Sequence, residues 1–346
     1  GKIISYCPHP YAFKPRKTAP MSALNRVAET LQTPRDLIRW GASQFNAHKL
    51  AFGHGNDNAL DEAAQLVLFA LHLPYDLPEA YLDARLTLDE RTTALGLIQQ
   101  RIDQRRPAAY ITGETLFAGL SFAVDERALV PRSPIAELIM RDFQPWLAGR
   151  EPRQILDLCT GCGAIAVACA LAFPEAEVVG TDLSEDALDL ARINAERHQV
   201  DMRVSMVKSD LFKALEGQKF DLIVTNPPYV GGEEIAGLAD EYRHEPEIAF
   251  AGGGDGLDMV ADLIMAAPDY LAEDGLLVIE VGYSAYFMEQ RWPDLPVTWA
   301  EMEHGGVGIG VLEAEDLSAW REMHLQELAG QEHSVQELSA SIEYGG

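Results

Sequence analysis

The segment Asn226-Pro227-Pro228-Tyr229 brings together one amide, two prolines and one aromatic ring. Proline has no N–H to donate and holds the residue before it extended, so this backbone is stiff. The side-chain oxygen of Asn226 and the carbonyl oxygen of Pro227 could accept both N–H groups of a planar nitrogen and aim its lone pair. Orienting a poor nucleophile in this way can lower the activation free energy by roughly several kcal/mol. The segment therefore suits group transfer to an amide or exocyclic amino nitrogen, and Tyr229 could stack on a flat substrate or face a cationic donor.

The residues before this segment predict where it lies in a fold. Residues 220–225 mix aromatic, apolar and β-branched types, which is typical of a buried strand. In an open α/β sheet, ligands bind outside the carboxyl ends of the strands, and Asn226 to Tyr229 fall at such an end. We take Asn226, Pro227, Pro228 and Tyr229 as candidate substrate-binding residues, and all of these except Pro228 as candidate catalytic residues. A plain turn after a core strand is the alternative interpretation.

A loop that contains glycines forms the second part of the candidate site. Asp157-x-x-Thr160-Gly161-x-Gly163 lies between a predicted strand and a predicted helix, and Asp182 ends the next predicted strand. Glycines let the backbone approach a ligand closely, and an acid at the end of the second strand can bind ribose hydroxyls. These five residues are therefore candidate cofactor-binding residues.

Asp210 follows the third predicted strand, so polar residues end four consecutive strands and converge on one crevice. NAD is the obvious alternative ligand, but Ala166 stands where the third glycine of its fingerprint would be. An amide braced by prolines also has no role in hydride transfer. S-adenosylmethionine fits better, with Asp182 on the ribose and Asp210 or the backbone at Leu211 near the adenine. The glycine loop would lie beside the methionine moiety, with Asn226 bordering the cofactor.

Composition and charge narrow the class of protein. The 346 residues suffice for two domains, and the apolar content of 47% is ordinary for a globular protein. The 54 acidic and 27 basic residues give a net charge of −27, which repels phosphate backbones and favours a basic protein partner over nucleic acid. Solubility or a salt-adapted source is the alternative explanation. No segment predicts a membrane span or a secretory signal, so a cytoplasmic enzyme is the simplest interpretation.

Cysteine spacing does not predict a metal site. Cys159 and Cys162 have the spacing of redox or zinc motifs, but no second cysteine pair or nearby histidine completes a site. Both cysteines lie inside the glycine loop, which already has a clear use. We therefore expect no metal, and the oligomeric state stays open.

The chain divides into segments of different character. Helical signals fill the first third, and from residue 154 onward strand and helix signals alternate, which predicts a parallel sheet. Arg132, fixed between Pro131 and Pro134, could bind a carboxylate or make a structural ion pair, and we count it as a further candidate substrate-binding residue. We predict these parts: a flexible leader at 1–20, a helical substrate-recognition domain at 21–106, a β-hairpin linker at 107–134, an α/β domain at 135–325 and a loose tail at 326–346.

These motifs together resemble the class I S-adenosylmethionine-dependent methyltransferases, specifically the protein-glutamine amide methyltransferases, from Met21 to Met323. Val-Pro-Arg-Ser-Pro-Ile-Ala-Glu-Leu-Ile at 130–139, Tyr-Arg-His-Glu-Pro-Glu at 242–247 and Gly-His-Gly-Asn-Asp-Asn at 53–58 are similar to the branch that acts on the third large-subunit ribosomal protein. The branch that acts on peptide release factors usually has Arg-Pro-acid-Thr-Glu in place of the first motif. The resemblance implies a Rossmann-like α/β fold with a seven-stranded, mostly parallel sheet, a small helical amino-terminal domain and a linking β-hairpin.

The resemblance also implies roles for individual residues. Asn226, Pro227 and Tyr229 would hold the substrate glutamine amide, and the glycine-loop residues with Asp182 and Asp210 would line the cofactor. Cys159 departs from the wider superfamily, which commonly has glycine there.

The implied function is methyl transfer to a glutamine amide of a basic ribosomal protein that docks on the helical domain. Three alternatives stay open at this point. They are methylation of the Gly-Gly-Gln glutamine of release factors, adenine amino methylation of nucleic acid, and a non-catalytic role in ribosome assembly.

Overall fold

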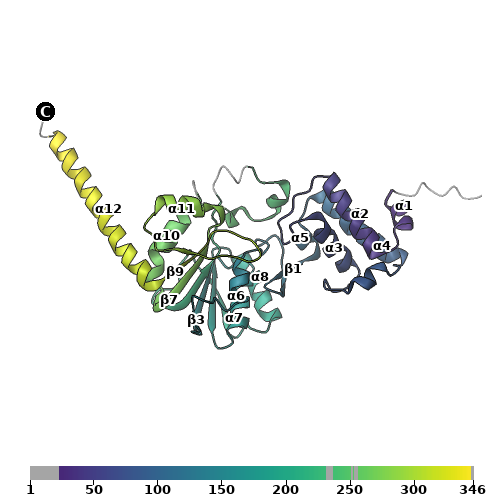
Figure 1. Cartoon of the computed structure of the whole chain (residues 1–346), viewed down its shortest axis with the longest axis horizontal. Coiled ribbons are helices and arrows are strands. Elements are labelled where there is room, and N and C mark those ends of the chain that lie inside the picture. Colours follow the sequence, from purple (N-terminus) through teal and green to yellow (C-terminus); the bar gives the residue numbers. More distant parts are fainter. Residues whose placement is uncertain (1–22, 231–236, 251, 253–255, 344–346) are drawn as a thin grey trace, which may run out of the picture.

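The computed structural model describes the backbone of residues 23–230, 237–250, 252 and 256–343, with side chains from residue 24 to residue 330. A helical domain lies at one end of the molecule and an α/β domain beside it, with a short hairpin between them (Figure 1). The expected leader at 1–20 lies outside the described residues. The domain boundaries given above stay predictions.

Paired side-chain caps begin two helices of the helical domain. Thr33 and Asp36 form a capping box at the start of α2, where Pro34 takes the first helical position, and Thr87 and Glu90 form another at α4. The apolar faces of these helices pack into one core. The helices are α1 (Ala23–Thr30), α2 (Pro34–Ala47), α3 (Ala59–Ala70), η1 (Glu79–Asp83), α4 (Leu88–Gln104) and α5 (Ala108–Thr112).

Seven strands form one sheet in the order β5-β4-β3-β6-β7-β9-β8. The neighbours from β5 to β7 pair in parallel, and β9 runs antiparallel to both β7 and β8. The predicted seven-stranded, mostly parallel sheet is confirmed. The strands are β3 (Gln154–Leu158), β4 (Glu177–Asp182), β5 (Val204–Lys208), β6 (Phe220–Thr225), β7 (Leu271–Glu280), β8 (Thr298–Trp299) and β9 (Ile309–Glu313).

Successive strand residues point to opposite faces, and each face has its own helices. Leu222 and Val224 share a core with α6 (Ile135–Ile139), α7 (Ala164–Ala172) and α8 (Glu185–Arg197). Ile223, between them in sequence, shares the other core with α10 (Asp258–Ala266), α11 (Ala285–Arg291) and α12 (Ala314–Glu343). Helices on both faces explain why the central strands are mostly apolar.

The linker forms a hairpin of β1 (Glu114–Phe117) and β2 (Leu120–Ala123). Residues 128–130 form no strand. The carbonyl of Ala128 accepts from the Tyr110 hydroxyl at 2.6 Å, and the Val130 N–H donates to Glu245 Oε1 at 3.0 Å. Side chains, rather than a neighbouring strand, satisfy this backbone.

Helix α12 begins against the sheet and then extends away from the body (Figure 1). Leu317 and Trp320 anchor its first turns in the core. The structure differs here from the expected loose tail at 326–346, because the helix continues to Glu343. The segment is rich in Glu, Gln, Ala and Leu, and the helix propensity of these residues outweighs the polarity that suggested a tail.

None of the helices in the described part of the chain combines the length and the apolar character that a bilayer-spanning segment needs.

Candidate active site

A cavity opens at the carboxyl ends of β3, β4, β5 and β6, with a volume of about 1030 Å³ that includes its mouth. The sequence-predicted residues that line it are Arg132, Thr160, Gly161, Asp182, Asp210, Leu211, Asn226 and Pro228. Four other predicted residues, Asp157, Gly163, Pro227 and Tyr229, are not part of its lining. The structure thus brings the glycine loop, both strand-end acids and the candidate amide to one space.

Three residues of the glycine loop have left-handed backbone conformations. Cys159, Gly161 and Gly163 have φ values of +60°, +55° and +80°. A Cβ on Gly163 would lie 2.9 Å from the Cβ of Ala191 on α8, so only glycine fits between loop and helix. A Cβ on Gly161 would meet nothing closer than 3.9 Å, so its backbone faces open space. The loop therefore offers exposed backbone to a ligand.

Asp157 does not line the cavity, but its side chain holds the glycine loop in place. Its Oδ2 accepts from Thr160 Oγ1 at 2.5 Å and from the Ala166 N–H at 2.9 Å. The residue is fully buried, and burial raises the pKa of Asp157 to about 7. Asp157 thus ties the end of β3 to the first turn of α7 and fixes Thr160 where it borders the cavity.

Asp182 ends β4 and lines the cavity. Its Oδ2 accepts from the Gly161 N–H at 2.9 Å and its Oδ1 from the Ser184 N–H at 2.9 Å. Each carboxylate oxygen keeps a further lone pair that a hydroxyl can use. Burial raises the pKa of Asp182, although the backbone N–H groups work in the opposite direction.

The loop after β5 supplies an apolar wall and a polar rim. Leu211 has φ of +49° and is half-buried in the cavity lining. The Ser209 hydroxyl holds this turn by donating to the Leu211 carbonyl at 2.6 Å. Asp210 is exposed at the rim and pairs with Lys213 at 2.5 Å. A flat apolar ring could lie against Leu211 with its polar edge toward Asp210.

Asn226 is half-buried, and within the described ranges of the chain its side chain has no hydrogen-bond partner. The strand end before it is rigid, because the buried Thr225 hydroxyl donates to the Leu158 carbonyl at 2.9 Å. Pro227 and Pro228 are buried beside it. The backbone at Asn226 is therefore held in place, and its side-chain amide is available to a ligand.

Tyr229 is turned away from the cavity lining toward β7. Its hydroxyl donates to Glu280 Oε1 at 2.8 Å, and a Cβ on Gly282 would lie 2.8 Å from its ring. The Ser133 hydroxyl donates to the other Glu280 oxygen. Burial raises the pKa of Glu280. The sequence analysis missed Glu280, although an acid that ends an apolar strand at the carboxyl edge is the signal that identified Asp182.

Arg132 makes the structural ion pair that was one of its two expected roles. Its Nη1 and Nη2 donate to Glu245 Oε1 at 2.7 Å and Oε2 at 3.0 Å. Burial alone would raise the pKa of Glu245, but His54 and Arg132 lower it. Arg132 still borders the cavity, so this buried pair fixes one wall.

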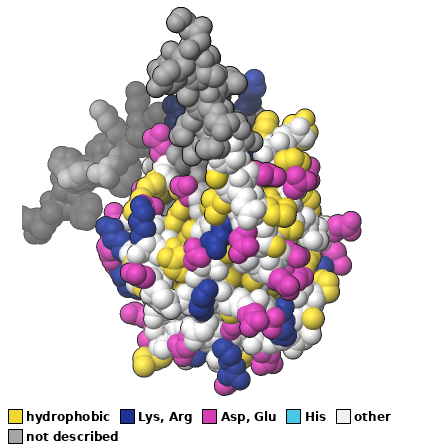
Figure 2. All heavy atoms as spheres, turned by 90° about the vertical axis from the view of Figure 1, so that its left-hand side faces the viewer, with side chains coloured by type: hydrophobic (Ala, Val, Ile, Leu, Met, Phe, Trp, Pro, Cys, Tyr) yellow, Lys and Arg dark blue, Asp and Glu magenta, His cyan; other side chains and the backbone are white. Residues whose placement is uncertain are grey.

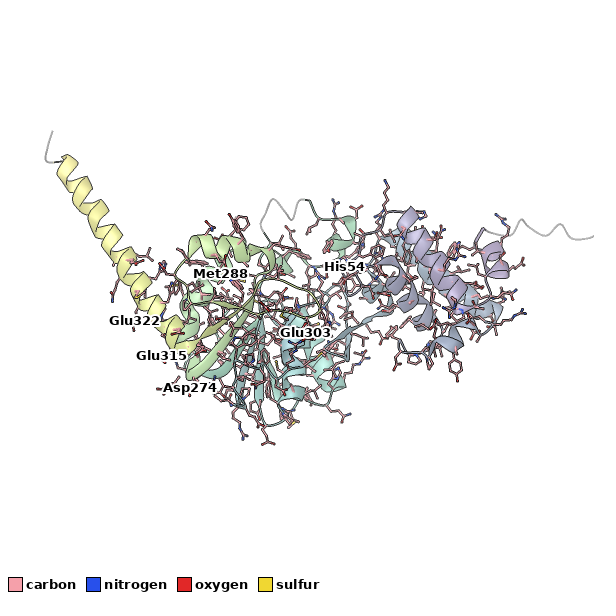
Figure 3. The ribbon with its side chains drawn as sticks, in the orientation of Figure 1. His54, Asp274, Met288, Glu303, Glu315 and Glu322 are labelled. Atoms are coloured by element: carbon pink, nitrogen blue, oxygen red, sulfur yellow. The ribbon has the colours of Figure 1, made fainter. Side chains whose placement is uncertain are left out.

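Buried charges also join the helical domain to residues 240–245. Arg101, with no exposed side-chain surface, pairs with Glu62 at 3.0 Å and with Glu241 at 3.4 Å. His244 Nε2 lies 3.0 Å from the Gln104 carbonyl oxygen. Figure 3 marks His54, beside this junction, between the two domains. The helical domain is therefore attached to a segment that packs next to the site.

The thiols of Cys159 and Cys162 in the loop are neutral. Burial raises the pKa of Cys162 to about 12, and it also raises the pKa of Cys159, which lines the cavity. A protonated thiol is a poor nucleophile and a poor metal ligand. In the described portion of the chain, no three His, Cys, Asp or Glu side chains are grouped so as to hold a metal ion.

Comparison with known proteins defines the class of this protein. Residues 136–242 match the family model "Methyltransferase small domain". A solved methyltransferase from Pyrococcus furiosus is 22% identical with a TM-score of 0.42, covering 62% of this chain and 97% of that one. The sheet order, the glycine loop and the matched model together make this chain a methyltransferase of the class I, Rossmann-like fold.

Two curated relatives define the particular family. The ribosomal protein uL3 glutamine methyltransferase of Xanthomonas campestris pv. campestris is 53% identical over 85% of this chain and 95% of its own length. The enzyme of the same name from Xylella fastidiosa is 50% identical over 85% of this chain and 94% of its length. The chain belongs to the family of ribosomal protein uL3 glutamine methyltransferases.

Proposed function

We propose that this enzyme transfers a methyl group from S-adenosylmethionine to the side-chain amide nitrogen of a glutamine in ribosomal protein uL3. The observation that carries the proposal is the placement of Asn226, whose amide borders the same cavity as Asp182 and the Gly161 backbone. The uL3 substrate follows from the names of relatives at 53% and 50% identity.

The residues that would hold the cofactor fit it chemically. When bound, S-adenosylmethionine supplies an electrophilic methyl on a sulfonium. Asp182 would accept from the ribose hydroxyls, and Leu211 would pack on the adenine with Asp210 at its edge. The open backbone at Gly161, with Thr160 beside it, would border the methionine moiety.

The chain's own residues would then orient the acceptor. The Asn226 side-chain oxygen and the Pro227 carbonyl would accept the two N–H groups of the glutamine amide, which leaves its lone pair directed at the methyl. Transfer forms the nitrogen–carbon bond as the carbon–sulfur bond breaks, and the methylated nitrogen then loses one proton to water. Because orientation supplies the rate enhancement, no strong general base is needed. Tyr229 would act by holding the segment against Glu280 rather than by touching the substrate.

The substrate protein would bring charge of opposite sign. The net charge of −27 attracts a basic ribosomal protein and repels nucleic acid, and we place the reaction in the cytoplasm, where such proteins are made. On the face seen in Figure 2, acidic side chains are spread among apolar and basic ones. The helical domain would contribute to docking through its attachment at Arg101 and Glu241. The association rate with uL3 should fall as salt is added.

The test is a methylation assay with purified enzyme and separate substrates, uL3 and a peptide release factor, followed by mass spectrometry of the modified residue. The proposal expects one methyl group on a uL3 glutamine amide and much slower modification of the release factor. A faster reaction on the release factor, or methylation of an adenine amino group in an RNA or DNA control, would contradict it.

A further inference from the structure

Three aromatic side chains stand exposed directly after β7. Tyr283, in η5 (Gly282–Ser284), is 84% exposed, and Tyr286 and Phe287, in α11, are 64% and 54% exposed. The rings of Tyr286 and Phe287 meet edge to face with centroids 5.6 Å apart. We call these three residues the 283–287 aromatic surface. Met288, the next residue, is buried and anchors α11 in the core (Figure 3).

The 283–287 aromatic surface is attached to residues 226–229, the segment that we propose binds the glutamine. Tyr283 stands between two residues that contact Tyr229. A Cβ on Gly282 would fall 2.8 Å from the Tyr229 ring, and the Ser284 hydroxyl donates to the Tyr229 carbonyl at 3.1 Å. Gly282 also has φ of +52°, which favours glycine. The aromatic surface therefore keeps a fixed position beside the candidate acceptor site.

Charge decides which partner this surface suits. Exposed aromatic faces attract Arg and Lys side chains. A second copy of this chain carries the same net charge of −27 and is repelled, whereas a basic ribosomal protein is attracted. Aromatic residues are also the commonest anchors of protein interfaces.

We propose that Tyr283, Tyr286 and Phe287 dock the protein substrate by packing against basic side chains near the target glutamine. The inference rests on the proposed function and adds to it a second contact surface, on the α/β domain. Contact here would place the glutamine next to Asn226 while the helical domain holds a more distant part of the substrate.

The test compares three variants of the full-length enzyme with intact uL3 as substrate. The first replaces Tyr283, Tyr286 and Phe287 with Ala, the second replaces the same residues with Leu, and the third replaces only the two tyrosines with Phe. Met202→Ala is the control, because Met202 is 89% exposed just before the start of β5, at the edge of the sheet opposite the cavity. Each variant is assayed for kcat and KM, for binding of S-adenosylhomocysteine by calorimetry, and for its melting temperature.

The proposal expects the triple Ala variant to lose about tenfold or more in kcat/KM, mainly through KM, with S-adenosylhomocysteine binding unchanged. The Leu variant should lose nearly as much because it lacks ring faces, whereas the Phe variant and Met202→Ala should match the wild type.

Unchanged kcat/KM in the triple Ala variant would overturn the proposal, as would an equal loss in Met202→Ala. A changed sedimentation coefficient with unchanged kcat/KM would assign the surface to contact between copies instead. A wild-type enzyme that does not methylate uL3 would overturn the proposed function itself, and this result differs from an active wild type with unaffected variants.

Discussion

The hydroxyl of Tyr229 donates to Oε1 of Glu280 at 2.8 Å, and this contact joins the ends of β6 and β7. The Ser133 hydroxyl donates to the other oxygen of the same carboxyl, so Glu280 also holds the segment that contains Arg132. One buried side chain thus fixes two walls of the site. Tyr229 and Glu280 are positioning residues, since neither lines the cavity.

Removing this hydroxyl should slow catalysis without affecting the cofactor. Tyr229→Phe deletes one hydrogen bond to a buried carboxyl, which should lower the free energy of unfolding by about 1–3 kcal/mol. We expect kcat to fall while the Kd for S-adenosylhomocysteine stays the same. Urea unfolding, steady-state kinetics and calorimetry measure these quantities. Tyr283→Phe is the control, and an equal loss of kcat in both variants would contradict a specific role for the Tyr229 hydroxyl.

The buried Asp157 should make stability depend on pH in a definite direction. Its pKa rises from 3.8 to about 7 in the folded protein because of burial. The folded state therefore binds the proton more tightly, and the stability that this gives is present below pH 4 and is lost as pH rises toward 7. Relative to Asp157→Asn, the wild type should lose stability between pH 4 and pH 7, by up to a few kcal/mol at about 1.4 per pH unit. Chemical unfolding at several pH values measures the free energy of unfolding of both proteins, and a wild type that gains stability relative to Asp157→Asn over this range would contradict the raised pKa.

Gly163 allows a matched test of the loop. Gly163→Ala places a Cβ 2.9 Å from Ala191 at φ of +80°, whereas Gly149→Ala has the same φ of +80° and nothing within 4 Å. Both variants should lose about 1 kcal/mol from backbone strain. Only Gly163→Ala should also bind S-adenosylhomocysteine about tenfold more weakly, because the loop must move. Equal affinities by calorimetry would show that the loop tolerates the added carbon.

Arg101 tests the connection between the helical domain and the site. Arg101→Met leaves Glu62 and Glu241 buried without this guanidinium, which should cost about 3–5 kcal/mol of stability and raise KM for uL3. Arg35→Met is the control, since its ion pairs with Glu79 and Asp83 are exposed to solvent and should contribute much less to stability. Thermal unfolding measures the change in stability, and kinetics at a temperature where both variants stay folded measure KM. An unchanged KM for uL3 in Arg101→Met would contradict a role of the helical domain in docking the substrate.

The sequence predicted the sheet and the position of the cavity because both follow from local patterns. Apolar runs that end in a polar residue place Asp182, Asp210 and Asn226 at the carboxyl edge of a parallel sheet. The capping boxes at Thr33 and Thr87 are local in the same sense, because each joins residues three apart in the chain.

Contacts between distant residues could not be predicted in the same way. Arg132 meets Glu245 and Tyr229 meets Glu280 only after the chain has folded, so no local spacing identifies either pair. The backbone at 128–130 has strand propensity, but the side chains of Tyr110 and Glu245 satisfy it instead of a ladder.

Replacement of Asn226 tests the central claim most directly. Single-turnover methylation of uL3 by Asn226→Ala should be slower than wild type by about a hundredfold or more, because the acceptor amide is no longer oriented. Calorimetry should show that S-adenosylhomocysteine still binds, since Asp182 and the glycine loop remain. A variant that binds the cofactor product normally and methylates uL3 at the wild-type rate would contradict the claim that Asn226 holds the glutamine amide.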